Sequence, residues 1–452
     1  MARQTAASNV MCRAFALCWF ALRLSWLAVL AASAQAGGEQ FIPVFTGREI
    51  KGPAGTATPA GMVDYLQMLN HRDGGINGVR LTWEECETAF DDERGVQCFE
   101  RLKRRGARGA AVIVPLSGGI SYTLTERARQ ARIPMLMLGY GRSDASDGRA
   151  FPYAFPVVTN LLSQGTAQIR FIGLSEGGME RLRAKKIVYL YLDIPTGREA
   201  IALLEHQASR YGFELTGIGV PLPGQDQQAS WDRIRRLAPD WVILAGPGPM
   251  TPAALKAAAA IRFPAQRIIG FGLSGAEQDV LPAGAAAVGY IAVALNPSGL
   301  NFKVIRDIVK HVHAPGRSGG GAAPAHIGSA YYNRGVILGI LIAESIHTAQ
   351  AKFGPSPLSG EQFRWGLERL ALDEQRLARL GALELLQPLS ISCYDHEGGG
   401  AVKFQQWLGN RWNVISDWIS ADQPLVRQLV EEQAARYAKD QGIALRDCAT
   451  EQ

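Results

Sequence analysis

The sequence predicts an α/β protein in which two doubly wound, mainly parallel sheets form two lobes joined by a hinge with several crossovers. Short apolar runs alternate with helix-like segments from Phe41 to Gly270, as in parallel sheets covered by helices. The alternation breaks once, at the proline- and aromatic-rich stretch 151–156, and then restarts. Beyond residue 295 come long helices and then a hairpin. Such an order requires the chain to cross between lobes more than once.

Length and composition agree with this organisation. The chain has 452 residues, of which 47% are hydrophobic and 19% charged, so it is globular and large enough for two or three domains. We expect a signal peptide at 1–36, a first lobe from 37–153 and 296–388, a second lobe from 154–295 and 389–420, and a C-terminal helix and tail at 421–452.

The first residues have the pattern of an export signal. Arg3 and Arg13 precede the apolar run 14–32, and Ala34-Gln35-Ala36 supplies the small-x-small cleavage pattern. We expect cleavage after Ala36 and a periplasmic mature protein. The alternative is an uncleaved anchor of about 20 residues, against which Arg23 interrupts the apolar run.

Charge and cysteine content limit the partners. The signal contains three of the 47 basic residues and no acidic one, so the mature chain has 44 basic and 41 acidic residues. This excess of positive charge is too small to indicate a nucleic-acid partner. Four cysteines remain, an even number that favours disulfides in an exported chain. We expect a Cys86–Cys98 bond, and a Cys393–Cys448 bond if the tail folds back; buried free thiols are the alternative. No spacing suggests a metal site.

The first lobe follows from four strand–helix units. Strands are predicted at 41–45, 79–83, 111–114 and 133–138, and helices at 60–70, at 94–105 and from Ser121 or Thr123 to Arg129. Apolar runs such as Ala111-Val112-Ile113-Val114 are typical of strands buried on both faces.

The second lobe repeats the alternation. Strands are predicted at 186–192, 213–220, 241–245, 267–270 and 290–295, and helices at 160–172, 198–211, 227–237 and from Thr251. Helices at 302–312, 326–353 and 361–370 follow, then a hairpin of 402–407 with 412–418, and a terminal amphipathic helix at 424–441.

The turn at Ser117-Gly118-Gly119 is a candidate anion site. It lies between a predicted strand and a predicted helix, where unpaired backbone N–H groups and the positive end of a helix dipole can receive a carboxylate. The alternative is an ordinary strand–helix turn whose glycines serve packing.

Several segments together carry a family resemblance. They are FIPVFTGREIKGPAG, NHRDGGINGVRLTWEECE, VIVPLSGG, YLYLDIPTGREA, RYGFELTGIGVPLPGQDQQASWDRIRRLAPDWVILAG and YNRGVILGILIAESIHTA. The mature chain resembles the periplasmic substrate-binding proteins of ABC importers, of the leucine/isoleucine/valine-binding type. The resemblance implies a type I periplasmic binding protein fold with three crossovers. It also implies a protein that closes on a small-molecule solute and delivers it to membrane permease subunits. We expect it to be a monomer and to need no cofactor. A sensory module of the same fold, reporting to a membrane partner, is the alternative.

The resemblance also assigns one half of a binding site. In the family, a serine and backbone amides after the third strand hold the ligand's carboxylate, which corresponds here to Ser117, Gly118 and Gly119. The loop after the fourth strand completes that half and corresponds to Gly139, Tyr140, Gly141, Arg142 and Ser143. Arg142 would favour an anionic ligand; a solvated loop arginine is the alternative.

The other half of the site departs from the family. The turns that should carry an acid and an aromatic residue for the ligand's ammonium read Phe271-Gly272-Leu273-Ser274 and Gly246-Pro247-Gly248-Pro249. We therefore expect Phe271, Leu273 and Gly248 to line the binding site, and Asp193 to bind an ammonium or hydroxyl group of the ligand. Glu277 and Asp279 are expected inside the following helix. A buried ammonium without an acid is costly, which argues against a zwitterionic aliphatic amino acid.

Four enzyme-like patterns are interpreted otherwise. Gly270 to Gly275 fits a dinucleotide-binding fingerprint, but the acidic residue expected about twenty residues later is missing. Gly173 to Gly177 fits a nucleophile elbow, but it follows a predicted helix instead of a strand, so we interpret it as the end of that helix. Asp395-His396-Glu397 and His311-Val312-His313 are expected at the surface. We predict no enzymatic activity.

Overall fold

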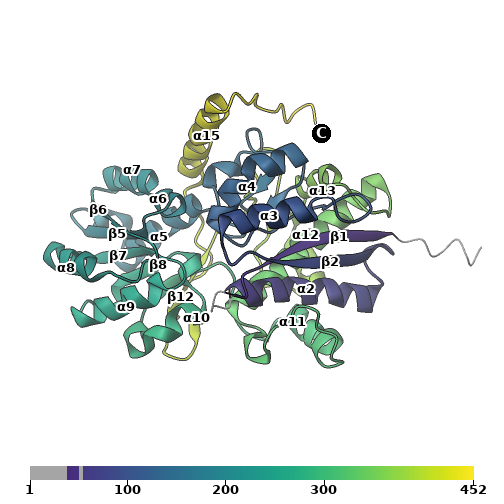
Figure 1. Cartoon of the computed structure of the whole chain (residues 1–452). Coiled ribbons are helices and arrows are strands. Elements are labelled where there is room, and N and C mark those ends of the chain that lie inside the picture. Colours follow the sequence, from purple (N-terminus) through teal and green to yellow (C-terminus); the bar gives the residue numbers. More distant parts are fainter. Residues whose placement is uncertain (1–37, 50–53, 452) are drawn as a thin grey trace, which may run out of the picture. The chain divides into compact units, whose positions relative to one another are not determined.

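The computed structural model describes residues 38–49 and 54–451 (Figure 1). Residues from Glu39 onward form one compact unit. The predicted signal peptide lies outside the described residues, so its cleavage after Ala36 stays a prediction. The α/β fold class is confirmed, because parallel strands dominate the sheets and alternate with helices.

The first lobe contains two parallel strand pairs. Its elements are β1 (Glu39–Thr46), α2 (Ala54–Asp73), β2 (Arg80–Glu87), α3 (Asp92–Leu102), α4 (Gly118–Ala131), β3 (Met135–Leu136) and β4 (Ala154–Phe155). β1 pairs with β2 along its whole length, and β3 pairs with β4.

The third and fourth predicted strands are shorter than expected. Residues 111–114 are buried but form only one bridge, from Ile113 to Met135, and the predicted strand 133–138 is reduced to β3. Pro115 and Pro134 flank this region and have no N–H to donate, which limits the ladder.

The second lobe is a seven-stranded sheet in the order β13-β12-β9-β8-β7-β5-β6. Its strands are β5 (Lys186–Leu192), β6 (Glu214–Val220), β7 (Trp241–Ala245), β8 (Ile268–Gly270), β9 (Ile291–Ala294), β12 (Lys403–Trp407) and β13 (Trp412–Val414). Its helices are α5 (Leu161–Ser175), α6 (Pro195–Arg198), α7 (Ile201–Tyr211), α8 (Gln228–Leu237), α9 (Met250–Ala260) and α10 (Glu277–Val280). The strands from β6 to β9 are parallel, and β12 and β13 are antiparallel.

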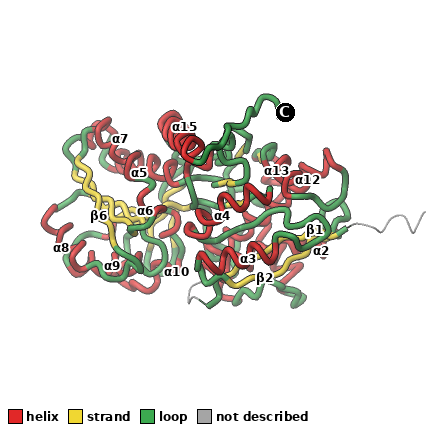
Figure 2. The backbone as a smooth tube through the Cα atoms, turned by 45° about the horizontal axis from the view of Figure 1, so that its top comes forward, coloured by secondary structure: helices red, strands yellow, loops and turns green. Residues whose placement is uncertain are grey.

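Side chains of β5 alternate between two buried faces of this sheet. Ile187 and Tyr189 belong to the cluster that includes residues of α5 and α7, whereas Val188 and Leu190 belong to the cluster that includes residues of α8 and α9. Figure 2 shows α5 and α7 on one side of these strands and α8 and α9 on the other. The continuous apolar run is therefore explained by burial on both faces.

The remaining helices and strands complete the lobes. They are α11 (Lys303–Ile308), α12 (Ala330–Phe353), α13 (Gly360–Leu367), β10 (Ala371–Leu372), α14 (Glu374–Leu380), β11 (Leu389–Ser390) and α15 (Gln423–Asp440). α12 is long and apolar enough to cross a membrane, but 72% of its apolar window is buried inside the protein. It is a core helix.

The second strand of the predicted hairpin ends early. β13 stops at Val414, where the predicted strand ran to Trp418. The Phe404 carbonyl still accepts from the Ile415 N–H at 2.8 Å, but the Phe404 N–H donates to the Ser416 hydroxyl at 2.8 Å, so a side chain takes the place of the next backbone acceptor. Pairing returns only as a bridge between Val402 and Ile419.

Two crossovers between the lobes run side by side. The Val158 N–H donates to the Glu397 carbonyl at 2.9 Å, and the Gly400 N–H donates to the Val158 carbonyl at 2.8 Å. Both expected disulfides, Cys86–Cys98 and Cys393–Cys448, are formed. The second one ties the C-terminal tail to the segment next to the crossover.

The surface position predicted for His396 is wrong. Its side chain is fully buried, stacks on Phe155 with ring centroids 3.7 Å apart, and contacts the Ala154 carbonyl and Glu368. The crossover at 395–402 passes through the interior, which sequence spacing does not reveal. His313 is only partly buried and contacts Asp64 at 3.0 Å. No cluster among the described residues could hold a metal ion.

A glycine contact between α2 and α12 provides a stability test. A Cβ atom at Gly335 would lie 1.9 Å from the Thr58 carbonyl oxygen. We expect Gly335→Ala to lower the free energy of unfolding by about 1–3 kcal/mol through overpacking, measured by urea denaturation. Gly217→Ala is the control, because its Cβ would meet only Tyr191, at 3.7 Å. Equal effects of the two changes would contradict this packing account.

Candidate functional site

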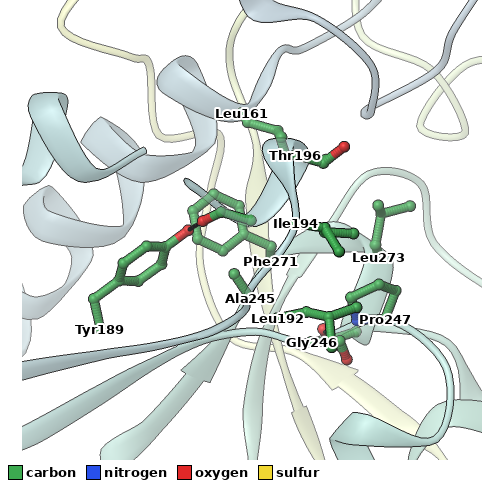
Figure 3. Close-up of a pocket in the computed structure, with 12 residues that line it drawn as sticks. Leu161, Tyr189, Leu192, Ile194, Thr196, Ala245, Gly246, Pro247, Phe271 and Leu273 are labelled. Atoms are coloured by element: carbon green, nitrogen blue, oxygen red, sulfur yellow. Dashed lines mark hydrogen bonds between the residues drawn. The ribbon is translucent and has the colours of Figure 1, made fainter. Parts of the chain in front are cut away.

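A pocket lies where β5, β7 and β8 end (Figure 3). Its lining residues are Leu161, Tyr189, Leu192, Ile194, Thr196, Gly197, Ala245, Gly246, Pro247, Phe271, Leu273 and Ser274. Ligands of doubly wound sheets bind beyond the carboxyl ends of the strands. The pocket therefore occupies the place where such a fold holds its ligand.

The pocket lining is mainly apolar and aromatic. The rings of Tyr189 and Phe271 meet edge to face, with centroids 6.3 Å apart. The Tyr189 hydroxyl donates to the Gly197 carbonyl at 2.7 Å, so it is already paired. No lining residue carries a charge. The pocket suits the uncharged body of a small molecule.

The turn at Ser117 lies beside this pocket, on the first lobe. A Cβ atom at Gly118 would be 2.6 Å from the Thr196 hydroxyl oxygen, and Thr196 lines the pocket. Gly118 thus permits a close approach between the lobes. The backbone of the predicted anion turn and the apolar pocket meet at one rim.

The helix after this turn begins earlier than predicted. Ser117 itself is the N-cap of α4, with its side chain accepting from the Ile120 N–H at 3.5 Å. Ser121 lies inside the first turn and donates to the Ser117 carbonyl at 2.6 Å, so neither it nor Thr123 is the cap. Gly118 and Gly119 therefore belong to the helix N-terminus, whose first N–H groups have no partner within the helix.

The loop at 139–143 lies against the same region. Gly139 has a φ of 75°, a conformation that favours glycine, and a Cβ there would also lie 2.4 Å from a Leu295 side-chain carbon. Arg142 is neither a solvated arginine nor part of the pocket lining. It pairs with Asp144 at 2.7 Å, and its guanidinium lies 4.2 Å from the ring centroid of Tyr437.

Of the four residues predicted for the second half of the site, two line the pocket and two do not. Phe271 and Leu273 line the pocket, whereas Asp193 and Gly248 do not. Asp193 pairs with Arg198 at 2.7 Å on the surface, and this contact holds the pKa of its carboxyl below the usual range.

Glu277 and Asp279 lie inside α10, as predicted. The Glu277 carboxylate accepts from the Ala330 N–H at 3.1 Å, and Asp279 accepts from the Tyr331 hydroxyl at 2.9 Å. Both acids therefore already have partners at the start of α12.

Sequence reasoning missed Glu199, which contacts the first lobe. Its carboxylate accepts from the backbone N–H of Ser143 at 3.0 Å and also from the hydroxyls of Ser143 and Tyr122. Burial raises the pKa of Glu199 to about 7, although the hydrogen bonds from Ser143 and Tyr122 lower it. Nearby Asp144 raises it further. Its place two residues after Gly197, in the family-like stretch, was the only sequence signal.

Comparisons with known proteins agree with this geometry. Residues 45–411 match the family described as periplasmic binding protein. A crystal structure titled an ABC transporter permease, from the Pseudomonas fluorescens group, is 44% identical, with a TM-score of 0.86, covering 91% of this chain and 100% of that one. A search of curated proteins found no match.

More distant solved structures share the fold. A branched-chain amino acid ABC transporter protein from Thermus thermophilus, with bound valine, is 17% identical with a TM-score of 0.69, covering 87% of this chain and 99% of that one. A solute-binding protein from R. palustris, in complex with benzoate, is 15% identical with a TM-score of 0.65, covering 85% and 97%.

The chain belongs to the periplasmic binding protein family. Membership of this family makes it a binding protein rather than an enzyme. Family membership implies a periplasmic or extracellular location.

The Glu199 contact predicts a pH dependence of stability. The pKa of an ordinary glutamate is 4.5 and that of folded Glu199 is about 7, so the folded protein retains a proton that the unfolded chain loses. Stability should therefore fall as pH rises from about 4.5 through 7. We expect Glu199→Gln to lower the number of protons released on unfolding in this range by up to about one. The number is obtained from the slope of the unfolding free energy against pH, measured by urea denaturation at several pH values.

Glu205→Gln is the matched control, because Glu205 lies on the exposed surface of α7. Asp279 and Glu397, whose pKa values are also raised by burial, should retain their part of the pH dependence in both variants. An unchanged slope in Glu199→Gln would show that Glu199 is ionised in the folded protein.

Proposed function

We propose that the protein captures a small solute with a carboxylate and an uncharged, apolar body, and delivers it to the permease subunits of an importer. The observation that carries this proposal is the uncharged aromatic pocket of Figure 3 beside the N-terminus of α4. The apolar wall suits the body, and the unpaired N–H groups suit the carboxylate.

The relatives support the solute class without fixing its identity. One binds valine and another benzoate, and both ligands carry a carboxylate on an apolar body. The pocket lining here has no acid for an ammonium. An acid without an amino group is therefore favoured over an amino acid, because a buried ammonium requires a partner.

The remaining parts of the proposal follow the family. The division into 37–153 with 296–388, 154–295 with 389–420, and the tail 421–452 is proposed as two closing lobes and a terminal segment. We propose that the protein acts as a monomer, exported by a cleaved signal.

The proposal is tested by ligand screening of the exported protein. Thermal-shift measurements should compare valine, benzoate, 4-hydroxybenzoate and short fatty acids with their amides. An acid at a hundred times its dissociation constant should stabilise the protein by about 2.7 kcal/mol. Permease and ATPase genes beside the coding sequence would support import; an adjacent sensor kinase without them would support a sensory role.

Ser117 provides a mutational test of the carboxylate contact. We expect Ser117→Ala to weaken binding of the selected acid by about 1–3 kcal/mol if the hydroxyl donates to it, measured by titration calorimetry. Thr123→Ala, on the exposed side of α4, is the control. Unchanged affinity in Ser117→Ala would move the carboxylate away from this turn.

A further inference from the structure

Arg334 is a buried cation at the start of α12, close to the pocket. It is only 5% exposed. One guanidinium nitrogen donates to the Gly272 carbonyl at 3.2 Å, and the guanidinium lies 5.1 Å from the ring centroid of Tyr331. Gly272 stands between Phe271 and Leu273, which both line the pocket. Arg334 thus reaches from α12 to the loop that forms one pocket wall.

No acid among the described residues pairs with Arg334. Nearby carboxylates act on it through their charge and not through a hydrogen bond, and its Nε has no hydrogen-bond partner among the described residues. Asp279 and Glu277 act on it electrostatically, but they accept hydrogen bonds from Tyr331 and Ala330 instead. A buried charge without a close partner is costly.

Tyr140, from the first lobe, brings a second polar group to this place. It is 6% exposed, and its hydroxyl donates no hydrogen bond to any described residue. Burial raises the pKa of this hydroxyl, whereas a contact from the backbone N–H of Leu116 and the charge of Arg334 lower it. Leu116 directly precedes Ser117.

These groups form one polar end beside the apolar pocket. Leu273 lines the pocket and also packs against the cluster that contains Tyr140. Arg334, Tyr140 and the turn at Ser117 come from three separate segments. The guanidinium, the hydroxyl and the N–H groups at the start of α4 are all hydrogen-bond donors. A carboxylate accepts several such donors at once.

We propose that Arg334 and Tyr140 bind the anionic group of the solute, and that the protein therefore selects organic carboxylates over their neutral amides. This inference rests on the proposed function and specifies its solute class. The guanidinium supplies the charge and Nε a free donor, the Tyr140 hydroxyl supplies a second donor, and the apolar pocket receives the rest of the solute. A solute without an ammonium group does not need the acidic residue with which other members of the family bind that group.

The experiment measures acid-against-amide selectivity. The exported protein is titrated with benzoate and benzamide, valine and valinamide, and butyrate and butyramide. We expect at least one acid to bind and its amide to bind at least tenfold more weakly. Arg334→Gln should weaken the acid at least tenfold while changing the amide little. Tyr140→Phe, which removes only the hydroxyl, should weaken the acid about threefold and keeps the test valid if Arg334→Gln fails to fold.

Arg364→Gln is the matched control, because that arginine is also largely covered, pairs with Glu451 and does not line the pocket. It should leave both affinities unchanged. Equal losses for acid and amide in Arg334→Gln would show a purely structural role and overturn the inference. Binding of amides without acids would overturn it too, while solute capture stands. Binding of nothing in the panel would overturn the proposed function, and the inference with it.

Discussion

The backbone pairing between the crossovers at Val158 and Glu397 is the constraint on which the two-lobed arrangement depends. Besides the backbone bonds, the Glu397 carboxylate accepts from the Asn160 backbone N–H at 2.7 Å and from its side-chain amide at 3.1 Å. Burial raises the pKa of Glu397 to about 8. The two crossovers are therefore held together at this strip.

The candidate site lies where the strands of the second lobe end, facing the first lobe. In the second lobe, β5, β7 and β8 end at an apolar pocket, and the first lobe presents the N-terminus of α4 beside it. Glu199 adds a direct contact from the second lobe to Tyr122 and Ser143 of the first. The apolar pocket and the helix N-terminus that we propose for the carboxylate therefore belong to different lobes.

The terminal helix α15 contacts both lobes. Its first half, including Leu425 and Leu429, packs in a cluster with Leu162 and Leu203, whereas Ala434 and Ala438 pack with the first-lobe cluster. The Cys393–Cys448 disulfide and the ion pair of Arg446 with Glu368 at 2.7 Å fix the segment that follows. The tail therefore belongs to the folded body and restrains the same crossover region.

The sequence by itself determined the α/β alternation, the bounds of β5 and β7, and the helical position of Glu277 and Asp279. These features depend on local periodicity and turn chemistry, which are written in neighbouring residues. Only the tertiary structure decided that Ser117 caps α4, that Arg142 pairs with Asp144, that His396 is buried, and that Glu199 and Arg334 reach the other lobe. These depend on contacts between residues far apart in the chain, because the burial and pairing of a polar side chain are set by what folds against it.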